Sequence, residues 1–231
     1  VAVETTYRKG GEHASEMATF SNQSNMNSIR DVGPIENEAA EVKQVNKDAK
    51  ILYIEADEDH VALQDKNKPR IEPKLICVYE DKERVCKGKR KLINSRFFGG
   101  YYYTPEELWL EVANYIDKNY DYDKIEKIYI SGDGASWIKS GLHWIHKSTY
   151  VLDKFHLKKY VKRIFNHLEE SSNYIKAYWE YLEDKNKEAI KVLLNESVDV
   201  AVLKEDKQLI KRVRKARRYI LNHYEASIKQ Y

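Results

Sequence analysis

Two short segments in which a strand-like apolar pattern ends on an aspartate constrain the fold of this chain most. Residues 51–57 read Ile-Leu-Tyr-Ile-Glu-Ala-Asp, and residues 127–133 read Lys-Ile-Tyr-Ile-Ser-Gly-Asp. Such β-branched and aromatic runs are typical of strands. A sheet that brings Asp57 and Asp133 to one edge offers carboxylate oxygens to a hard cation, Mg²⁺ or Mn²⁺. The spacing therefore suggests metal-dependent phosphoryl transfer on nucleic acid.

The charge of the chain is unevenly distributed. Of its 231 residues, 42% are hydrophobic and 33% are charged, enough for one large or two small domains. The net charge is +3, but residues 154–231 contain 18 Lys or Arg against 11 Asp or Glu, which leaves about −4 on the remainder. A basic C-terminal part beside an acidic part fits a polyanionic partner, and a solvated charged helix is the simpler alternative.

Several classes of protein are disfavoured. No apolar run approaches membrane-spanning length, and the N-terminus lacks the pattern of a secretory signal, so we expect a cytoplasmic, nucleoid-associated protein without a membrane partner. Cys77 and Cys86 flank a predicted turn, and reduced structural thiols are favoured over a disulfide or a zinc site. The chain begins at Val1 and ends at Tyr231 inside an expected helix, which indicates a piece of a longer protein.

The first 49 residues are expected to precede the catalytic part. Residues 1–30 have a helical, polar pattern, and residues 21–30 fit the second helix of a helix-turn-helix remnant whose Ser, Asn and Gln side chains would contact DNA. Because these residues form helices weakly, an ordinary surface helix is an equally good interpretation. Residues 31–49 are predicted to be a linker.

From residue 50 the pattern predicts a mixed α/β fold. Short charged connectors favour an antiparallel arrangement of the first three strands. Thr104-Pro105-Glu106-Glu107 combines an N-cap, a first-turn proline and first-turn acids, so a helix is expected to begin there. The expected elements are strands at 51–63, 73–80 and 91–103, a helix after 104, a strand at 125–131, a helix at 137–145, a strand at 148–152, and helices to the C-terminus.

This order is that of a ribonuclease-H-like core: three antiparallel strands, then strand-helix repeats, followed by a helical C-terminal insertion. In that fold the first acid lies on the central first strand and the second follows the fourth strand, its neighbour. We assign residues 50–165 to the catalytic core and residues 166–231 to a basic helical insertion. A fold by itself does not establish function.

The acidic candidates each have an alternative interpretation. Glu55, Asp57 and Asp59 share one strand face and repel each other unless a cation neutralises them, and Asp57 is preferred to Asp59 as a metal ligand; a sheet edge with solvated acids is the alternative. Asp133 lies between two glycines, which permit a sharp turn and the close approach of a phosphate. An ordinary strand-to-helix turn with an Asp cap is the alternative. His156 is a supporting catalytic candidate that would orient a water, contact a phosphate or only cap a helix.

Two basic clusters are candidate DNA contacts. One spans residues 87–91, and the other spans residues 204–218, where Ile210 and Val213 leave an apolar seam. Such stripes can follow a DNA backbone and make affinity strongly salt-dependent, although charged solvent-exposed helices are common. The candidate residues are Lys89, Arg90, Lys91, Lys211, Arg212, Arg214, Lys215, Arg217 and Arg218.

Three motifs in order, residues 53–61, 130–138 and 152–156, resemble the bacterial insertion-sequence transposases of the Lre group. The resemblance runs from about residue 50 to the C-terminus, and more weakly through residues 1–30. That family, formerly catalogued as uncharacterised, belongs with the DDE transposases on a ribonuclease-H-like fold. It implies a DNA transposase that cleaves and transfers strands of double-stranded DNA at element ends and target with two Mg²⁺ or Mn²⁺ ions, with a homo-oligomer as a candidate assembly.

The resemblance also implies roles for single residues. Asp57 would bridge the ions, Asp133 would hold one, and the Asp153–His156 motif would lie beside the active site. The family's third acid is a Glu in an Ala-Glu-Gly-His-type segment after a long helical insertion. Glu225 stands in a different context, so we expect a chain truncated at both ends with weak or absent cleavage. A non-catalytic DNA-binding or regulatory remnant and a ribonuclease-H-like nuclease or resolvase are the alternatives.

Overall fold

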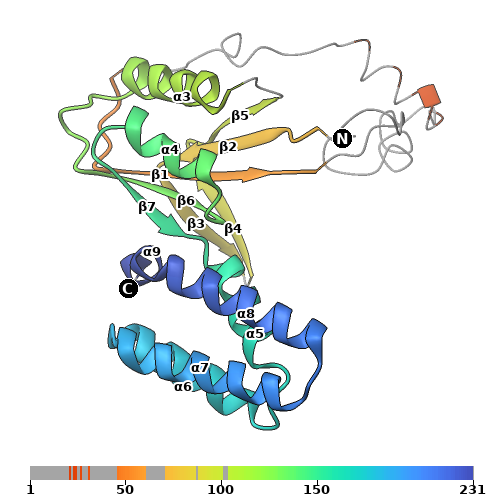
Figure 1. Ribbon diagram of the computed structural model, residues 1–231. Coiled ribbons are helices and arrows are strands. Elements are labelled where there is room, and N and C mark those ends of the chain that lie inside the picture. The colour runs from red at the N-terminus through yellow and green to blue at the C-terminus, as the bar shows by residue number, and fades with distance from the viewer. Residues whose placement is uncertain are drawn as a thin grey trace. The chain divides into compact units, whose positions relative to one another are not determined.

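A five-stranded mixed sheet organises the part of the chain that the structure describes (Figure 1). The strand order is β5-β2-β1-β6-β7, in which β1 is central, β2 and β5 continue from it in antiparallel fashion, and β6 and β7 continue in parallel. Its strands are β1 (Ile51–Glu58), β2 (Lys74–Tyr79), β5 (Arg96–Gly100), β6 (Lys127–Gly132) and β7 (Ser148–Leu152). The mixed α/β class expected from the sequence is confirmed.

The computed structural model describes Ser21, Gln23, Ser24, Asn27, Asp31 and residues 46–60, 71–86, 88–100 and 104–230. The chain divides into two compact units, Val1–Glu41 and Val42–Tyr231. The helix-turn-helix expected within residues 1–30 and the linker expected over residues 31–49 lie mostly outside the described residues, so both stay predictions.

One face of the sheet is buried and the other is partly open. On β1 the alternating residues Leu52, Ile54 and Ala56 are buried, whereas Glu55 and Asp57 on the opposite face are exposed. Helices α3 (Pro105–Asn119) and α4 (Ser136–Trp144) pack into the same apolar core as the buried residues. Strand alternation therefore keeps the two acids of β1 away from this core.

The local signals at the start of α3 are confirmed. Thr104 is the N-cap, its hydroxyl accepts the Glu107 N–H, and the Glu107 carboxylate accepts the Thr104 N–H, which forms a capping box. The fifth core strand has the bounds predicted from the sequence, 148–152.

The strand predicted at 91–103 is wrong as a single element. It divides into β4 (Lys89–Ile93) and β5, because Asn94 adopts a φ of 51° and its side-chain amide donates to Glu80. β4 pairs instead with β3 (Asp81–Cys86) in a separate two-stranded ribbon. The strand predicted at 51–63 ends at Glu58, and residues 61–63 and 101–103 lie outside the described residues.

Five helices follow β7, as the pattern predicted, and they share the core of the sheet. Buried side chains of these helices, including Leu157, Leu194 and Ile220, belong to one apolar cluster with those of β1 and β6. None of the helices in the described ranges is long and apolar enough to cross a membrane. The helices are α5 (Lys154–Phe165), α6 (Ser171–Glu183), α7 (Lys187–Leu203), α8 (Lys207–Asn222) and α9 (Tyr224–Ser227), and a 3₁₀ turn (Ile228–Gln230) ends the described chain.

Candidate functional site

Three aspartates lie at one level where the parallel strands end. Glu55 pairs with Ser131, so the register brings Asp57 level with Asp133. Gly132 pairs with Leu152, which brings Asp133 level with Asp153. The Asp153 N–H donates to the Gly132 carbonyl at 2.9 Å, so this ladder continues to the last residue before α5. Since the carboxyl ends of neighbouring parallel strands share one edge, the three side chains start from adjacent points.

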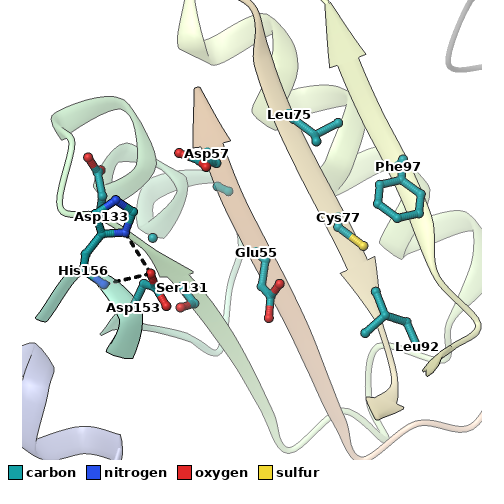
Figure 2. A pocket seen from close by; sticks show the side chains of 12 residues that line it. Glu55, Asp57, Leu75, Cys77, Leu92, Phe97, Ser131, Asp133, Asp153 and His156 are labelled. Carbon is teal, nitrogen blue, oxygen red and sulfur yellow. Dashed lines mark hydrogen bonds and ion pairs between the residues drawn. The ribbon is translucent and has the colours of Figure 1, made fainter. Parts of the chain in front are cut away.

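A pocket of about 300 Å³ opens at this edge, on the partly open face of the sheet (Figure 2). Carboxylates lie along one wall, and apolar side chains of β2, β4 and β5 form the other. Its lining residues are Glu55, Ala56, Asp57, Leu75, Cys77, Leu92, Phe97, Ser131, Gly132, Asp133, Asp153 and His156.

Two of the four pocket carboxylates have cationic or ring partners. Glu55 forms an ion pair with Lys82 at 2.5 Å and accepts the Tyr79 hydroxyl at 2.9 Å. Asp153 caps α5 by accepting backbone N–H groups of its first turn, and one of its oxygens lies 2.8 Å from His156 Nδ1. These contacts compensate the charge of Glu55 and orient the imidazole of His156.

Among the described residues, the carboxylates of Asp57 and Asp133 have only backbone partners. One oxygen of Asp57 accepts the Glu58 N–H at 2.9 Å, and one oxygen of Asp133 accepts the Ala135 N–H at 2.9 Å. Neither carboxylate forms an ion pair with any residue that the structure describes. Two neighbouring carboxylates without a cation repel each other, and a bound cation would remove that repulsion.

The described residues do not provide a complete protein-only metal site. Within them, no group of three or more His, Cys, Asp or Glu side chains lies close enough together to hold a metal ion. Asp59 lies beyond the end of β1, does not line the pocket, and accepts the His60 N–H at 2.8 Å. The arrangement favours Asp57 over Asp59 and offers two carboxylates.

Among the pocket residues, Cys77 has a clearly raised thiol pKa. Burial, followed by the charge of Glu55, raises the pKa of its thiol to about 11, so the thiol is protonated at neutral pH and is not a ready nucleophile. Cys77 and Cys86 are both free, as the sequence suggested.

Sequence reasoning missed the compensation of Glu55, and it placed Asp153 beside the active site only through the family resemblance. Asp153 had the same signal as the other two acids, since it directly follows an apolar strand. The pairing of Glu55 with Lys82 depends on where the β3–β4 ribbon lies, and no sequence pattern predicted that ribbon. His156 also lines the pocket, and its supporting catalytic role stays a prediction.

The predicted DNA contacts lie on two elements, β4 and α8. Lys89, Arg90 and Lys91 are exposed on β4. The candidate DNA contacts on α8 (Lys207–Asn222) lie around the buried apolar face of that helix. None of them forms an ion pair with a carboxylate in the part of the chain that the structure describes. On α8, Lys211, Arg212, Arg214, Lys215 and Arg218 are exposed and Arg217 is half-buried.

The neighbouring helix α5 adds cations that sequence reasoning did not select. α5 contains five Lys or Arg and α8 contains seven, with no Asp or Glu in either helix. The two helices pack together, and a hollow of about 360 Å³ lies between them. We call this hollow the α5–α8 groove; it is lined by Lys159, Lys162, Arg163, Asn166 and Arg212.

Comparison with known proteins finds relatives along the whole chain. The sequence model described as Uncharacterised protein family (UPF0236) matches residues 1–231. A UPF0236 protein of Caldanaerobacter subterraneus subsp. tengcongensis, whose name joins eleven gene designations, is 41% identical over 225 residues. Another from that organism, whose name joins four designations, is 39% identical, and the UPF0236 protein in the vanSb 3′ region of Streptococcus gallolyticus is 30% identical over 182 residues.

These matches cover this chain more fully than they cover the relatives. The first two span 97% of this chain but 45% of each relative, and the third spans 77% of this chain and 38% of the relative. The chain therefore spans less than half the length of these curated relatives. No solved structure matches it.

Proposed function

The chain belongs to the uncharacterised protein family UPF0236, and we propose that it contributes two metal-binding carboxylates to a transposase that cleaves and transfers strands of double-stranded DNA. Asp57 and Asp133 are the proposed ligands, and His156 is a supporting residue beside them. The observation that carries the proposal is the pair of uncompensated carboxylates at one strand edge.

The donor set fits Mg²⁺ or Mn²⁺. Mg²⁺ is commonly bound through one or two carboxylates together with waters and substrate phosphates, so two aspartates are sufficient on the protein side. When bound, such ions supply activation of an attacking oxygen and stabilisation of a leaving oxygen. The chain's own contribution is to hold Asp57 and Asp133 at one level and, through Asp153, to fix the His156 ring beside them.

The strand order supports the ribonuclease-H-like interpretation. In that fold the first acid lies on the central strand and the second follows its parallel neighbour. Asp57 lies on β1, the third of five strands, and Asp133 directly follows β6, which is hydrogen-bonded to β1. The order does not by itself distinguish a transposase from a nuclease or resolvase of the same fold.

DNA as the partner is supported by the α5–α8 groove. α5 and α8 carry many positive charges and no Asp or Glu, so their surface attracts anions. The phosphodiester backbone of DNA supplies anions at regular spacing. α5 begins directly after Asp153, a pocket residue, so the cationic surface is continuous in sequence with the acidic site.

The names of the relatives support transposition over other uses of the fold. One name joins eleven gene designations from a single organism and another joins four. Such multiplicity is expected of a gene that copies itself within a genome.

A second function, DNA binding without catalysis, is favoured by a different observation. Among the described residues, no three His, Cys, Asp or Glu side chains lie close enough together to hold a metal ion. A chain with this surface and no complete site would occupy DNA ends without cutting them.

Calorimetric titration of the chain with Mn²⁺ tests the proposal. We expect saturable binding in the wild-type chain and its loss in Asp57→Asn and in Asp133→Asn. Glu126→Gln is the matched control, because this exposed carboxylate lies before β6, at the end opposite Asp133, and pairs with Lys50. Binding that survives Asp57→Asn would refute the assignment. DNA binding without any Mn²⁺ binding would favour the non-catalytic function.

A further inference from the structure

The loop at residues 132–134 is hydrogen-bonded on both sides of Asp133. The Tyr150 hydroxyl donates to the Gly132 carbonyl at 2.9 Å, and the Tyr219 hydroxyl donates to the Asp133 carbonyl at 2.5 Å. These carbonyls belong to the two peptide planes that flank the Asp133 α-carbon. Because each peptide is rigid, holding both planes restricts the backbone dihedrals of Asp133 and therefore the direction of its Cα–Cβ bond.

His223, which directly follows α8, packs on Gly134, the residue after Asp133. Gly134 has a φ of 103°, and a Cβ at that position would lie 2.2 Å from His223 Nε2, so the imidazole packs directly on the glycine. His223 Nδ1 lies 2.8 Å from the Tyr219 carbonyl, which only accepts, so Nδ1 carries the proton. The other nitrogen accepts from Lys139 at 3.3 Å, and the ring orientation is thereby set.

Tyr219 is itself held in place. Its ring stacks on Tyr160 of α5 with centroids 3.7 Å apart and planes inclined by 11°. Burial, and next the charge of Asp133, raises the pKa of the Tyr219 hydroxyl, which therefore remains a donor at neutral pH. The buried face of α8, including Ala216 and Ile220, anchors this end of the helix in the core.

We propose that Tyr219 and His223 are positioning residues through which α8 holds the Asp133 loop in its metal-binding conformation. This inference rests on the proposed function, since a fixed carboxylate matters when it binds a cation. Neither residue lines the pocket, so both act through the loop backbone. A preorganised ligand lowers the cost of binding, and a loop free to turn would lose part of the metal affinity.

Tyr219→Phe tests the anchor, with Tyr160→Phe as the matched control. Both changes remove one hydroxyl from the same stacked pair, but only Tyr219 donates to the loop. Hydrogen exchange of the amides of residues 132–136 is the primary measurement, and the Mn²⁺ dissociation constant is the second. Loss of one such hydrogen bond should speed exchange and weaken Mn²⁺ binding by about fivefold, at a similar melting temperature. Tyr160→Phe should change neither.

Equal exchange rates in the two variants would overturn the role of Tyr219. If the wild-type chain binds no Mn²⁺, the proposed function is wrong, while the exchange comparison still decides whether the loop is anchored by α8.

A double-mutant cycle tests His223 separately. Gly134→Ala should destabilise the chain through its positive φ and through collision with the imidazole. Adding His223→Ala should restore the stability lost through the collision, but not the stability lost through the positive φ. A double variant no more stable than Gly134→Ala would overturn the role of His223.

Discussion

At the scale of single residues, the partners of each carboxylate decide which acids remain available. Glu55 and Asp57 are two residues apart on the same face of β1, but Glu55 contacts Lys82 and Asp57 contacts only a backbone N–H. An acid already paired with a lysine gains less from a cation than one facing another carboxylate. The structure therefore distinguishes two acids that are nearly equivalent in the sequence.

This difference predicts opposite stability effects for two similar substitutions. In the absence of metal, Asp57→Asn removes a repulsion and should raise the free energy of unfolding by about 0.5 kcal/mol. Glu55→Gln removes an ion pair that is partly screened by solvent and should lower it by a similar amount, about 0.5 kcal/mol. Urea denaturation in EDTA measures both. If both substitutions destabilise the chain, Asp57 is already compensated and the argument for a cation loses its basis.

At the scale of elements, α8 combines two surfaces that point to different tasks. Leu209, Val213 and Ala216 bury one side of the helix in the core, and Asp206 caps its N-terminus by accepting two backbone N–H groups. The remaining surface carries cations without carboxylates. The cap and the apolar side stabilise the helix, so its cations extend from a well-anchored backbone.

The α5–α8 groove predicts a measurable salt dependence. A chain with Lys162→Gln and Arg212→Gln should bind a DNA duplex more weakly, and the slope of log Kd against log salt should fall by about 2, one for each lost phosphate contact. Fluorescence anisotropy over a series of salt concentrations measures the slope. Lys176→Gln, on α6, is the matched control, because Lys176 is exposed and already paired with Glu180. Equal slopes in the two variants would contradict a role of the groove in DNA binding.

Elements with a strong local signal could be predicted from the sequence, and those defined by distant contacts could not. The start of α3 follows from the capping box at Thr104 and Glu107, a local interaction. The break at Asn94 was missed because it depends on a contact with Glu80, fourteen residues away. The hydrogen bond from Tyr219 to Asp133 joins residues 86 apart in sequence, and no periodicity reports such a contact.

The same division applies to the candidate site. Asp57 and Asp133 were found because each ends an apolar strand, which is a local pattern. That their charges lack a partner among the described residues depends on the tertiary positions of lysines and histidines. The roles of both acids, and of the predicted DNA contacts, stay predictions until metal and DNA binding are measured.

At the scale of the molecule, the described parts of residues 46–230 share one apolar core, to which both the sheet and the C-terminal helices contribute. Buried residues of β1, such as Leu52, belong to the same apolar cluster as Leu194 of α7 and Val213 of α8. α9 and the final 3₁₀ turn pack beside β7, which closes the connection between the helices and the sheet. Buried residues on both sides of the predicted boundary between residues 165 and 166 belong to this cluster, and the boundary itself stays a prediction.

Leu194→Ala should accordingly weaken the sheet as well as the helices. Leu194 is fully buried in α7, and truncating such a side chain costs about 2–5 kcal/mol. Because the core is continuous, we expect the amides of the sheet (β1 and β6) and those of the helices (α7 and α8) to lose protection at the same urea concentration. Leu194→Ala should lower the urea midpoint of the sheet and that of the helices equally. Hydrogen exchange followed by mass spectrometry across a urea series resolves these segments. Val192→Ala, an exposed position on the same helix, is the control and should leave both midpoints in place. If the helices lose protection first while the sheet keeps its midpoint, α8 can detach from the Asp133 loop without global unfolding. The proposed metal site would then depend on a helix that unfolds independently of the sheet.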